Sequence, residues 1–100
     1  MNTFELARFR VASQDAEKLL ARWPAAVEAI RTACTGLIDA KLVRIDETTW
    51  MDIWQWESHD LAKVAAQTAP SLPSAALMFS LITEPPTIEH GEIVLSKAVS

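Results

Sequence analysis

The sequence is poor in the residues that build disulfide and metal sites. Its 100 residues include one cysteine, Cys34, and two histidines, His59 and His90. One cysteine cannot form an internal disulfide, and so small a set shows no recognisable metal-ligand spacing. We therefore expect neither a disulfide framework nor a metal site.

Long apolar runs and clusters of positive charge are also absent. No apolar stretch approaches the roughly 20 residues that a membrane-spanning helix needs, and the N-terminal Met-Asn-Thr-Phe-Glu lacks the layout of a signal peptide. Lysine and arginine form no run and the net charge is -4, which argues against a nucleic-acid surface. These absences predict a cytoplasmic protein that binds neither membranes nor nucleic acids. Small molecules and protein partners remain as candidates.

The composition and the element pattern indicate one domain. Half of the residues are apolar, which is enough for a single hydrophobic core in a chain of this length. No repeat, low-complexity segment or linker divides the sequence, so residues 1–100 are predicted to form a single domain.

The most informative stretch is residues 49–58, T-W-M-D-I-W-Q-W-E-S, which contains three of the four tryptophans. Alternation is the period of a β-strand, so Trp50, Asp52, Trp54 and Trp56 are predicted to share one face. That face is aromatic and contains a carboxylate.

The remaining elements follow from periodicity and from breaker residues. Residues 4–11 alternate as a first strand with Ala7, Phe9 and Val11 on one face. Ser13 is a candidate N-cap for an amphipathic helix that Pro24 is expected to kink. Gly36 is a natural stop for that helix.

The second half of the chain supplies two more strands and further helix. Residues 37–45 read as a strand with Ile38, Ala40 and Leu42 on one face, and they form a hairpin with the tryptophan strand. Ser58 can cap a second helix, residues 74–82 can form another helical piece, and residues 87–95 return to strand alternation.

The resulting order, β-α-β-β-α-β, is typical of a ferredoxin-like α+β fold. Its four-stranded antiparallel sheet carries both helices on one face. The other face would present Leu6, Met51 and Ile53, and an apolar face of this kind usually meets a partner. A second copy packed sheet to sheet about a two-fold axis is the expected partner.

Three runs carry a resemblance to a known family: W-M-D-I-W-Q-W-E-S-H-D-L-A, the early A-R-F-R-V, and A-C-T-G-L near the end of the first helix. With the order of elements, they resemble the antibiotic biosynthesis monooxygenase family of dimeric α/β barrels. The resemblance spans nearly the whole chain. It implies that two sheets close into a barrel across a dimer, and that a pocket lined by Trp56 lies between sheet and helices.

The resemblance implies a range of functions rather than one. Members include cofactor-independent oxygenases of polycyclic aromatic polyketides, quinol oxygenases, haem-degrading enzymes and proteins without an assigned reaction. The haem-degrading branch has an Asn on strand one and a His on the second helix besides the strand-three Trp. Trp56 matches, but the strand-one position is Ala7 and His59 comes too early in the helix, which argues against haem as a substrate.

The aromatic face admits two interpretations. Trp54 and Trp56 can be plain core, each burying about 150 to 250 Å², or they can stack on a flat aromatic ligand. A carboxylate between tryptophans is costly unless it is paired or hydrated. Asp52 therefore indicates either a wet pocket or a partner such as an arginine, unless it lies at a solvated strand edge.

His90 is the candidate general base. An imidazole can accept a proton from a phenolic substrate, and the resulting electron-rich anion can reduce dioxygen without flavin or metal. The alternative is a hydrogen-bonded structural histidine. Cys34, on the apolar stripe of the first helix and with no base beside it, reads as a core residue.

Our working hypothesis is a homodimeric oxygenase without a cofactor, acting on a small aromatic molecule. Its pocket residues would be Phe9, Trp54, Trp56, Met78 and Phe79, with His90 and Asp52 as the polar groups. A non-catalytic ligand-binding or accessory protein and a structural dimer with a filled core are the alternatives. A cavity of about 300 Å³ or more beside Trp56 would favour ligand binding over a filled core.

Overall fold

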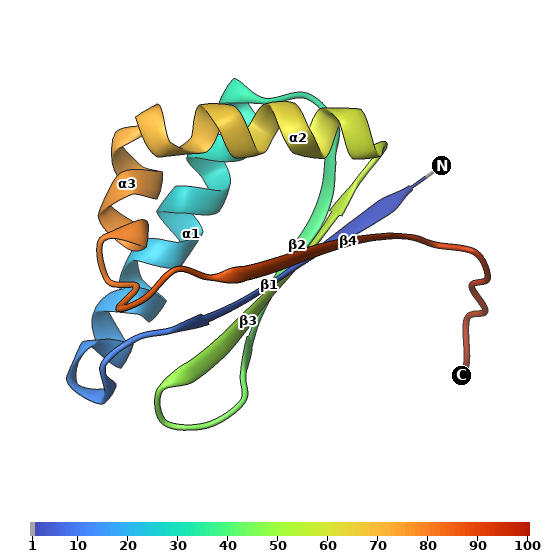
Figure 1. Ribbon diagram of the computed structural model, residues 1–100. Helices are drawn as coiled ribbons and strands as arrows, with labels where there is room; N and C mark the ends of the chain where they lie inside the picture. Colours follow the sequence, from blue (N-terminus) through green and yellow to red (C-terminus); the bar gives the residue numbers. More distant parts are fainter. Residues whose placement is uncertain (1) are drawn as a thin grey trace.

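Residues 2–100, described by a computed structural model, form a four-stranded antiparallel sheet with helices packed on one face (Figure 1). This arrangement confirms the expected ferredoxin-like α+β fold. The elements in chain order are β1 (Thr3–Arg10), α1 (Ala16–Ala33), β2 (Leu37–Arg44), β3 (Thr49–Trp56), α2 (His59–Thr68), α3 (Pro73–Phe79) and β4 (Thr87–Glu92).

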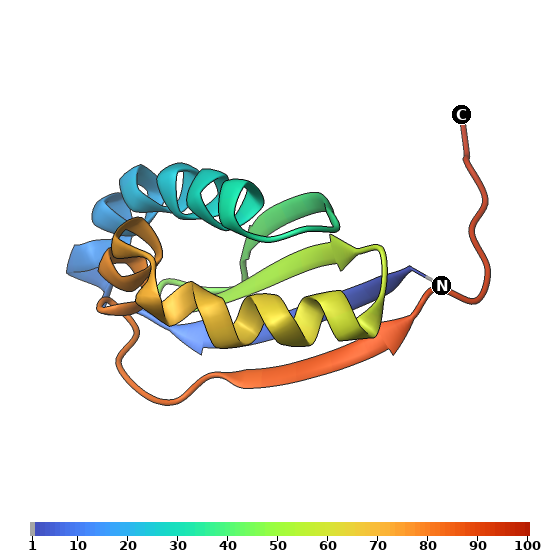
Figure 2. The ribbon, with the colours of Figure 1, turned by 90° about the horizontal axis from the view of Figure 1, so that it is seen from above.

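The sheet places the tryptophan strand beside β1. The strand order is β2-β3-β1-β4, which can be followed across the sheet in Figure 2. Along β3 every second residue is buried, as the alternation predicted. The register pairs Glu5 of β1 with Trp54 and Ala7 with Asp52. The inner face of β1 therefore lies next to the aromatic face of β3.

The start of α1 differs from the expectation. Ser13 does not cap the helix, which begins at Ala16 after a 3₁₀ turn over Ser13–Asp15. The backbone closes that turn itself, because the Asp15 N–H donates to the Ala12 carbonyl at 2.9 Å. Pro24 lies inside α1 and does not end it.

A bulge in β2 corrects a second expectation, since Ile38 does not share the inner face with Ala40 and Leu42. The register shifts between Leu37 and Asp39, and Leu37 takes the position opposite Trp56. Leu37 packs against the core, whereas Ile38 is 47% exposed. One extra residue in a strand reverses the alternation beyond it, which sequence periodicity does not reveal.

The segment between α3 and β4 is held against the end of β1. Val11 forms an isolated β-bridge with Ile82, and the Thr83 N–H donates to the Arg10 carbonyl at 3.0 Å. These bonds attach residues 82 and 83 to the end of β1. They therefore fix the point from which the following segment, with Pro85 and Pro86, leads into β4.

Among residues 2–100, no helix covers the other face of the sheet (Figure 1). Leu6, Met51 and Ile53 are partly exposed there, and Val43 is 39% exposed. After β4, residues 93–100 extend away from the rest of the molecule (Figures 1 and 2). Within residues 2–100, no helix combines the length and apolar character needed to cross a membrane.

Candidate functional site

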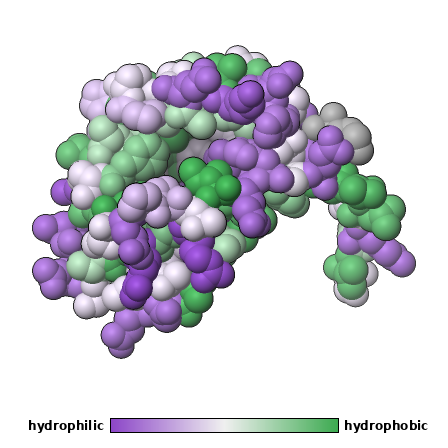
Figure 3. Space-filling view, in the orientation of Figure 1, coloured by the Kyte–Doolittle hydropathy of each residue, from purple (hydrophilic) through white to green (hydrophobic). Residues whose placement is uncertain are grey.

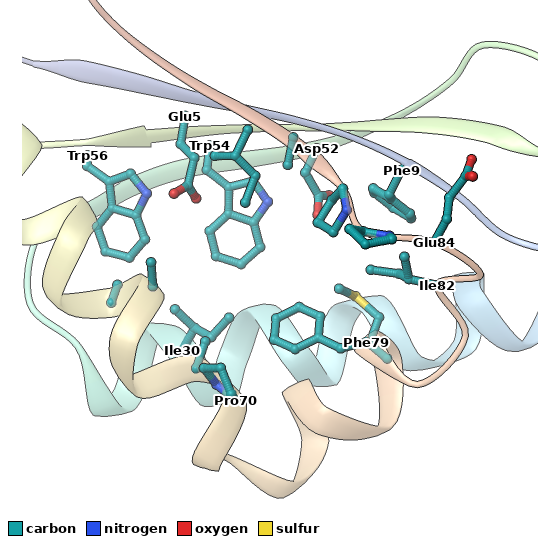
Figure 4. A pocket seen from close by; sticks show the side chains of 18 of the residues that line it. Glu5, Phe9, Ile30, Asp52, Trp54, Trp56, Pro70, Phe79, Ile82 and Glu84 are labelled. Atoms are coloured by element: carbon teal, nitrogen blue, oxygen red, sulfur yellow. The ribbon is translucent and has the colours of Figure 1, made fainter.

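A cavity of about 570 Å³ lies between the inner face of the sheet and helices α2 and α3. Figure 3 shows the surface hollowed between α2 and the segment that leads into β4, and Figure 4 shows the side chains around the cavity. The lining consists mainly of apolar side chains from β1, β3, α2, α3 and the 82–88 segment. It comprises Glu5, Ala7, Phe9, Ile30, Asp52, Trp54, Trp56, Ala65, Ala66, Ala69, Pro70, Met78, Phe79, Ile82, Thr83, Glu84, Pro85, Pro86 and Ile88.

The structure brings together all five residues that the sequence analysis placed in a pocket wall. They are Phe9, Trp54, Trp56, Met78 and Phe79. The rings of Trp54 and Trp56 are stacked, with centroids 6.2 Å apart and planes 18° from parallel. The cavity volume of about 570 Å³ exceeds the expected threshold of about 300 Å³ for a small-molecule site. The space between sheet and helices is therefore not a filled core.

Two buried hydrogen-bond donors belong to this aromatic wall. The indole Nε1 atoms of Trp54 and Trp56 have no hydrogen-bond partner within residues 2–100. Leaving a buried donor without an acceptor costs about 1 to 3 kcal/mol. Both atoms are buried, so the indoles offer the cavity their ring carbons rather than their N–H groups.

Asp52 is buried rather than solvated at an edge, because only 8% of the residue is exposed. Its partner is not an arginine: Trp23 of α1 donates from Nε1 to Asp52 Oδ1 at 2.8 Å. Burial raises the pKa of Asp52 to about 6. The hydrogen bond from Trp23 and the proximity of the Trp54 indole oppose this shift, and the charge of Glu5 adds to it. Trp54 lies near the carboxylate without completing a hydrogen bond.

His90 does not line the cavity but touches a residue that does. Its Nε2 lies 3.0 Å from Oε2 of Glu5, whose carboxylate points toward the cavity in Figure 4. The ring of His59, at the start of α2, meets the His90 ring edge-on with centroids 4.9 Å apart. Glu5 was not among the residues predicted for the site, although its alternation with Ala7 and Phe9 was a usable signal.

Among residues 2–100, the charged groups that line the cavity are all acidic. Glu5, Asp52 and Glu84 are its titratable lining residues, and Glu84 also lies 3.9 Å from Arg10 outside. An anionic ligand would be repelled by such a lining. No cluster of three His, Cys, Asp or Glu side chains able to hold a metal ion occurs in residues 2–100.

Cys34 stays apart from the cavity. It follows the end of α1, packs against the core and is partly buried. Burial raises the pKa of its thiol, which lowers the share of reactive thiolate.

Solved structures show where this fold has been seen before. A provisionally named antibiotic biosynthesis monooxygenase from Caulobacter crescentus superimposes with a TM-score of 0.76 at 18% identity, covering 94% of this chain and 91% of that one. One from Bordetella bronchiseptica gives 0.68 at 25% identity, covering 94% and 98%. SnoaB, a cofactor-independent oxygenase from Streptomyces nogalater, gives 0.61 at 24% identity, covering 98% and 96%.

The fold is therefore that of the antibiotic biosynthesis monooxygenase structures, as the sequence resemblance implied. No family model and no curated protein matches the sequence. The likeness thus rests on the arrangement of the elements.

Proposed function

We propose that this protein is a cofactor-independent monooxygenase acting on a small aromatic substrate of the phenol, anthrone or hydroquinone type. The observation that carries the proposal is the cavity of about 570 Å³ beside Trp54 and Trp56. Its apolar walls suit a flat ring system. The acidic lining favours a neutral substrate over an anionic one.

The proposed chemistry draws its electrons from the substrate. A base removes a proton from an acidic C–H or O–H bond, and the resulting anion reduces dioxygen. For a ring CH₂ group the overall change is CH₂ + O₂ to C=O + H₂O, so one oxygen atom enters the product and the other leaves as water. The groups available for proton transfer are Asp52 and Glu5, which line the cavity, and His90, which contacts Glu5.

The likeness to SnoaB supports this reaction class, because that protein is itself a cofactor-independent oxygenase. The proposal includes a homodimer in which the uncovered sheet faces of two copies meet. Partly exposed Leu6, Met51 and Ile53 would form the centre of that interface.

Oxygen consumption tests the proposal. The protein is incubated aerobically with anthrone, 1-naphthol and hydroquinone while oxygen uptake and product mass are followed. We expect uptake above the buffer rate with at least one compound and a product that has gained one oxygen atom and lost two hydrogens, because the second oxygen atom leaves as water. Trp54→Ala should bind the active compound more weakly, whereas Ala21→Ser on the exposed face of α1 serves as a matched control.

A non-catalytic binding protein is the second candidate. It is favoured by one observation, namely that His90 does not itself line the cavity. Quenching of tryptophan fluorescence by the same compounds without oxygen uptake would establish this alternative. Absence of both quenching and uptake would contradict both functions.

A further inference from the structure

Glu5 places a carboxylate at the cavity, where the sequence predicted Asp52 and His90 as the polar residues. It lines the cavity opposite Trp54 on the neighbouring strand, and in Figure 4 it points inward in the interval between the rings of Trp54 and Trp56. Its side chain is 17% exposed. A molecule that fills the cavity beside these indoles would lie against this carboxylate.

Glu5 also has a route by which a proton can leave. Oε2 of Glu5 lies 3.0 Å from Nε2 of His90, a hydrogen-bond distance that serves transfer in either direction. The His90 side chain is 23% exposed and contacts the exposed His59 at the start of α2. The path from the cavity to solvent therefore runs from the Glu5 carboxylate on β1 to the His90 imidazole on the neighbouring strand β4.

Asp52 has no hydrogen-bonded neighbour within residues 2–100 that could accept a proton from it. Its described partner is the indole N–H of Trp23, and an indole nitrogen donates a hydrogen bond but does not accept a proton. A proton taken up by Asp52 would remain between buried tryptophans. Between Asp52 and Glu5, it is Glu5 that is joined to a second titratable group by a hydrogen bond within residues 2–100.

We infer that Glu5 is the catalytic residue that takes the substrate proton, and that His90 is a positioning residue that then carries this proton to solvent. This inference rests on the proposed function. In the first step a substrate C–H or O–H bond breaks and an O–H bond forms on Glu5. In the second step that O–H bond breaks as the proton moves to Nε2 of His90 in its Nδ1–H tautomer, which restores the carboxylate and gives an imidazolium. The imidazolium then releases its Nδ1 proton to water, and exchange of the Nε2 proton with solvent returns the starting tautomer.

Hydrogen exchange without oxygen isolates the proton step from the oxygenation. Anthrone is incubated anaerobically with the protein in D₂O, and deuterium at its acidic CH₂ group is followed by mass spectrometry. The wild type should exchange faster than buffer. Because a positioned base typically contributes about 10²- to 10⁴-fold, Glu5→Gln should slow the enzyme-dependent exchange by about a hundredfold, while Glu5→Asp should recover part of it.

Two further variants separate Glu5 from its neighbour and from unspecific effects. His90→Gln keeps an amide donor for Glu5 but cannot carry a proton, so it should lower the exchange rate at saturating anthrone without changing the half-saturating concentration. Glu17→Gln, on the exposed surface of α1, removes the same charge elsewhere and should exchange like the wild type. Fluorescence quenching by anthrone checks that Glu5→Gln still folds and binds.

The outcomes distinguish this inference from the proposed function. Exchange by Glu5→Gln as fast as the wild type, or no exchange by the wild type, would overturn the role of Glu5. Equal oxygen uptake by Glu5→Gln and the wild type would also overturn it, yet would leave the oxygenase standing. Exchange that depends on Glu5 without any oxygen uptake would support the proton acceptor and contradict the oxygenase.

Discussion

The indole N–H of Trp23 donates to the buried carboxylate of Asp52 at 2.8 Å, and so joins the middle of α1 to the centre of β3. The bond offsets part of the cost of burying a charge, but burial still raises the pKa of Asp52 to about 6. The fold therefore favours the protonated form of this carboxyl.

This preference predicts a pH-dependent stability. A carboxyl whose pKa is higher in the folded than in the unfolded chain stabilises fully below the unfolded value of about 3.9, and its contribution is lost as the pH rises through 6. Asp52→Asn should remove this loss, because the amide oxygen can still accept from Trp23 and carries no charge. Relative to the wild type, the variant should gain about 3 kcal/mol between pH 4 and pH 8.

Urea unfolding at pH 4, 6 and 8 measures that gain. Asp39→Asn at an exposed position of β2 is the matched control and should not show it. A constant difference between Asp52→Asn and the wild type at all three pH values would contradict the shifted carboxyl.

Removing only the donor should have a related effect. Trp23→Phe keeps an aromatic ring in α1 but leaves Asp52 without its indole N–H. A hydrogen bond to a charged group is worth about 1.5 to 3 kcal/mol, so we expect a loss of this size at pH 8 and a smaller loss at pH 4. Unfolding curves at the two pH values test this expectation, and equal losses would point to packing alone.

Narrowing the cavity should weaken ligand binding without unfolding the protein. Ala66 of α2 lines the cavity yet is exposed, so a phenyl group at this position can enter the opening without displacing core atoms. We expect Ala66→Phe to lower the affinity for 1-naphthol about tenfold, equivalent to about 1.4 kcal/mol, as measured by fluorescence quenching. Ala21→Phe, on the exposed face of α1, should leave the affinity unchanged.

The turn after α1 should tolerate only glycine. Gly36 has φ of 99°, and a Cβ atom there would lie 2.5 Å from Cδ1 of Leu61. Gly36→Ala should therefore lower the free energy of unfolding by about 1 to 3 kcal/mol. Gly91→Ala is the matched control, since a Cβ at Gly91 meets nothing within 4 Å.

A second variant divides the Gly36 effect into its two causes. Adding Leu61→Ala to Gly36→Ala removes the clash but retains the left-handed backbone, so the two substitutions should be less costly together than their separate effects predict. Simple additivity in denaturant unfolding would show that the clash contributes nothing.

If two copies pair through their uncovered sheet faces, a charged side chain on that face should prevent dimerisation. Ile53→Lys places an ammonium group in the centre of that face, and burying an unpaired charge is unfavourable. Light scattering at micromolar concentration should give a dimer for the wild type and a monomer for Ile53→Lys. Val64→Lys, at a 54% exposed position on α2, should remain dimeric. A monomeric wild type would contradict the proposed assembly.

The sequence by itself determined the elements and which face of the central strand is buried. The alternation through Trp50, Trp54 and Trp56 defines an inner face whatever the neighbouring strands do, because side chains of a strand point to opposite sides in turn. The family resemblance added the expectation of a pocket between sheet and helices, and the five aromatic and thioether side chains assigned to it line the cavity.

Only the tertiary structure decided which polar groups meet. Trp23 and Asp52 are 29 residues apart and Glu5 and His90 are 85 apart, so their contacts depend on strand order and register, which no local pattern encodes. The bulge at Leu37 and the 3₁₀ turn before α1 likewise depend on how the backbone satisfies its hydrogen bonds in the assembled sheet and helix layer.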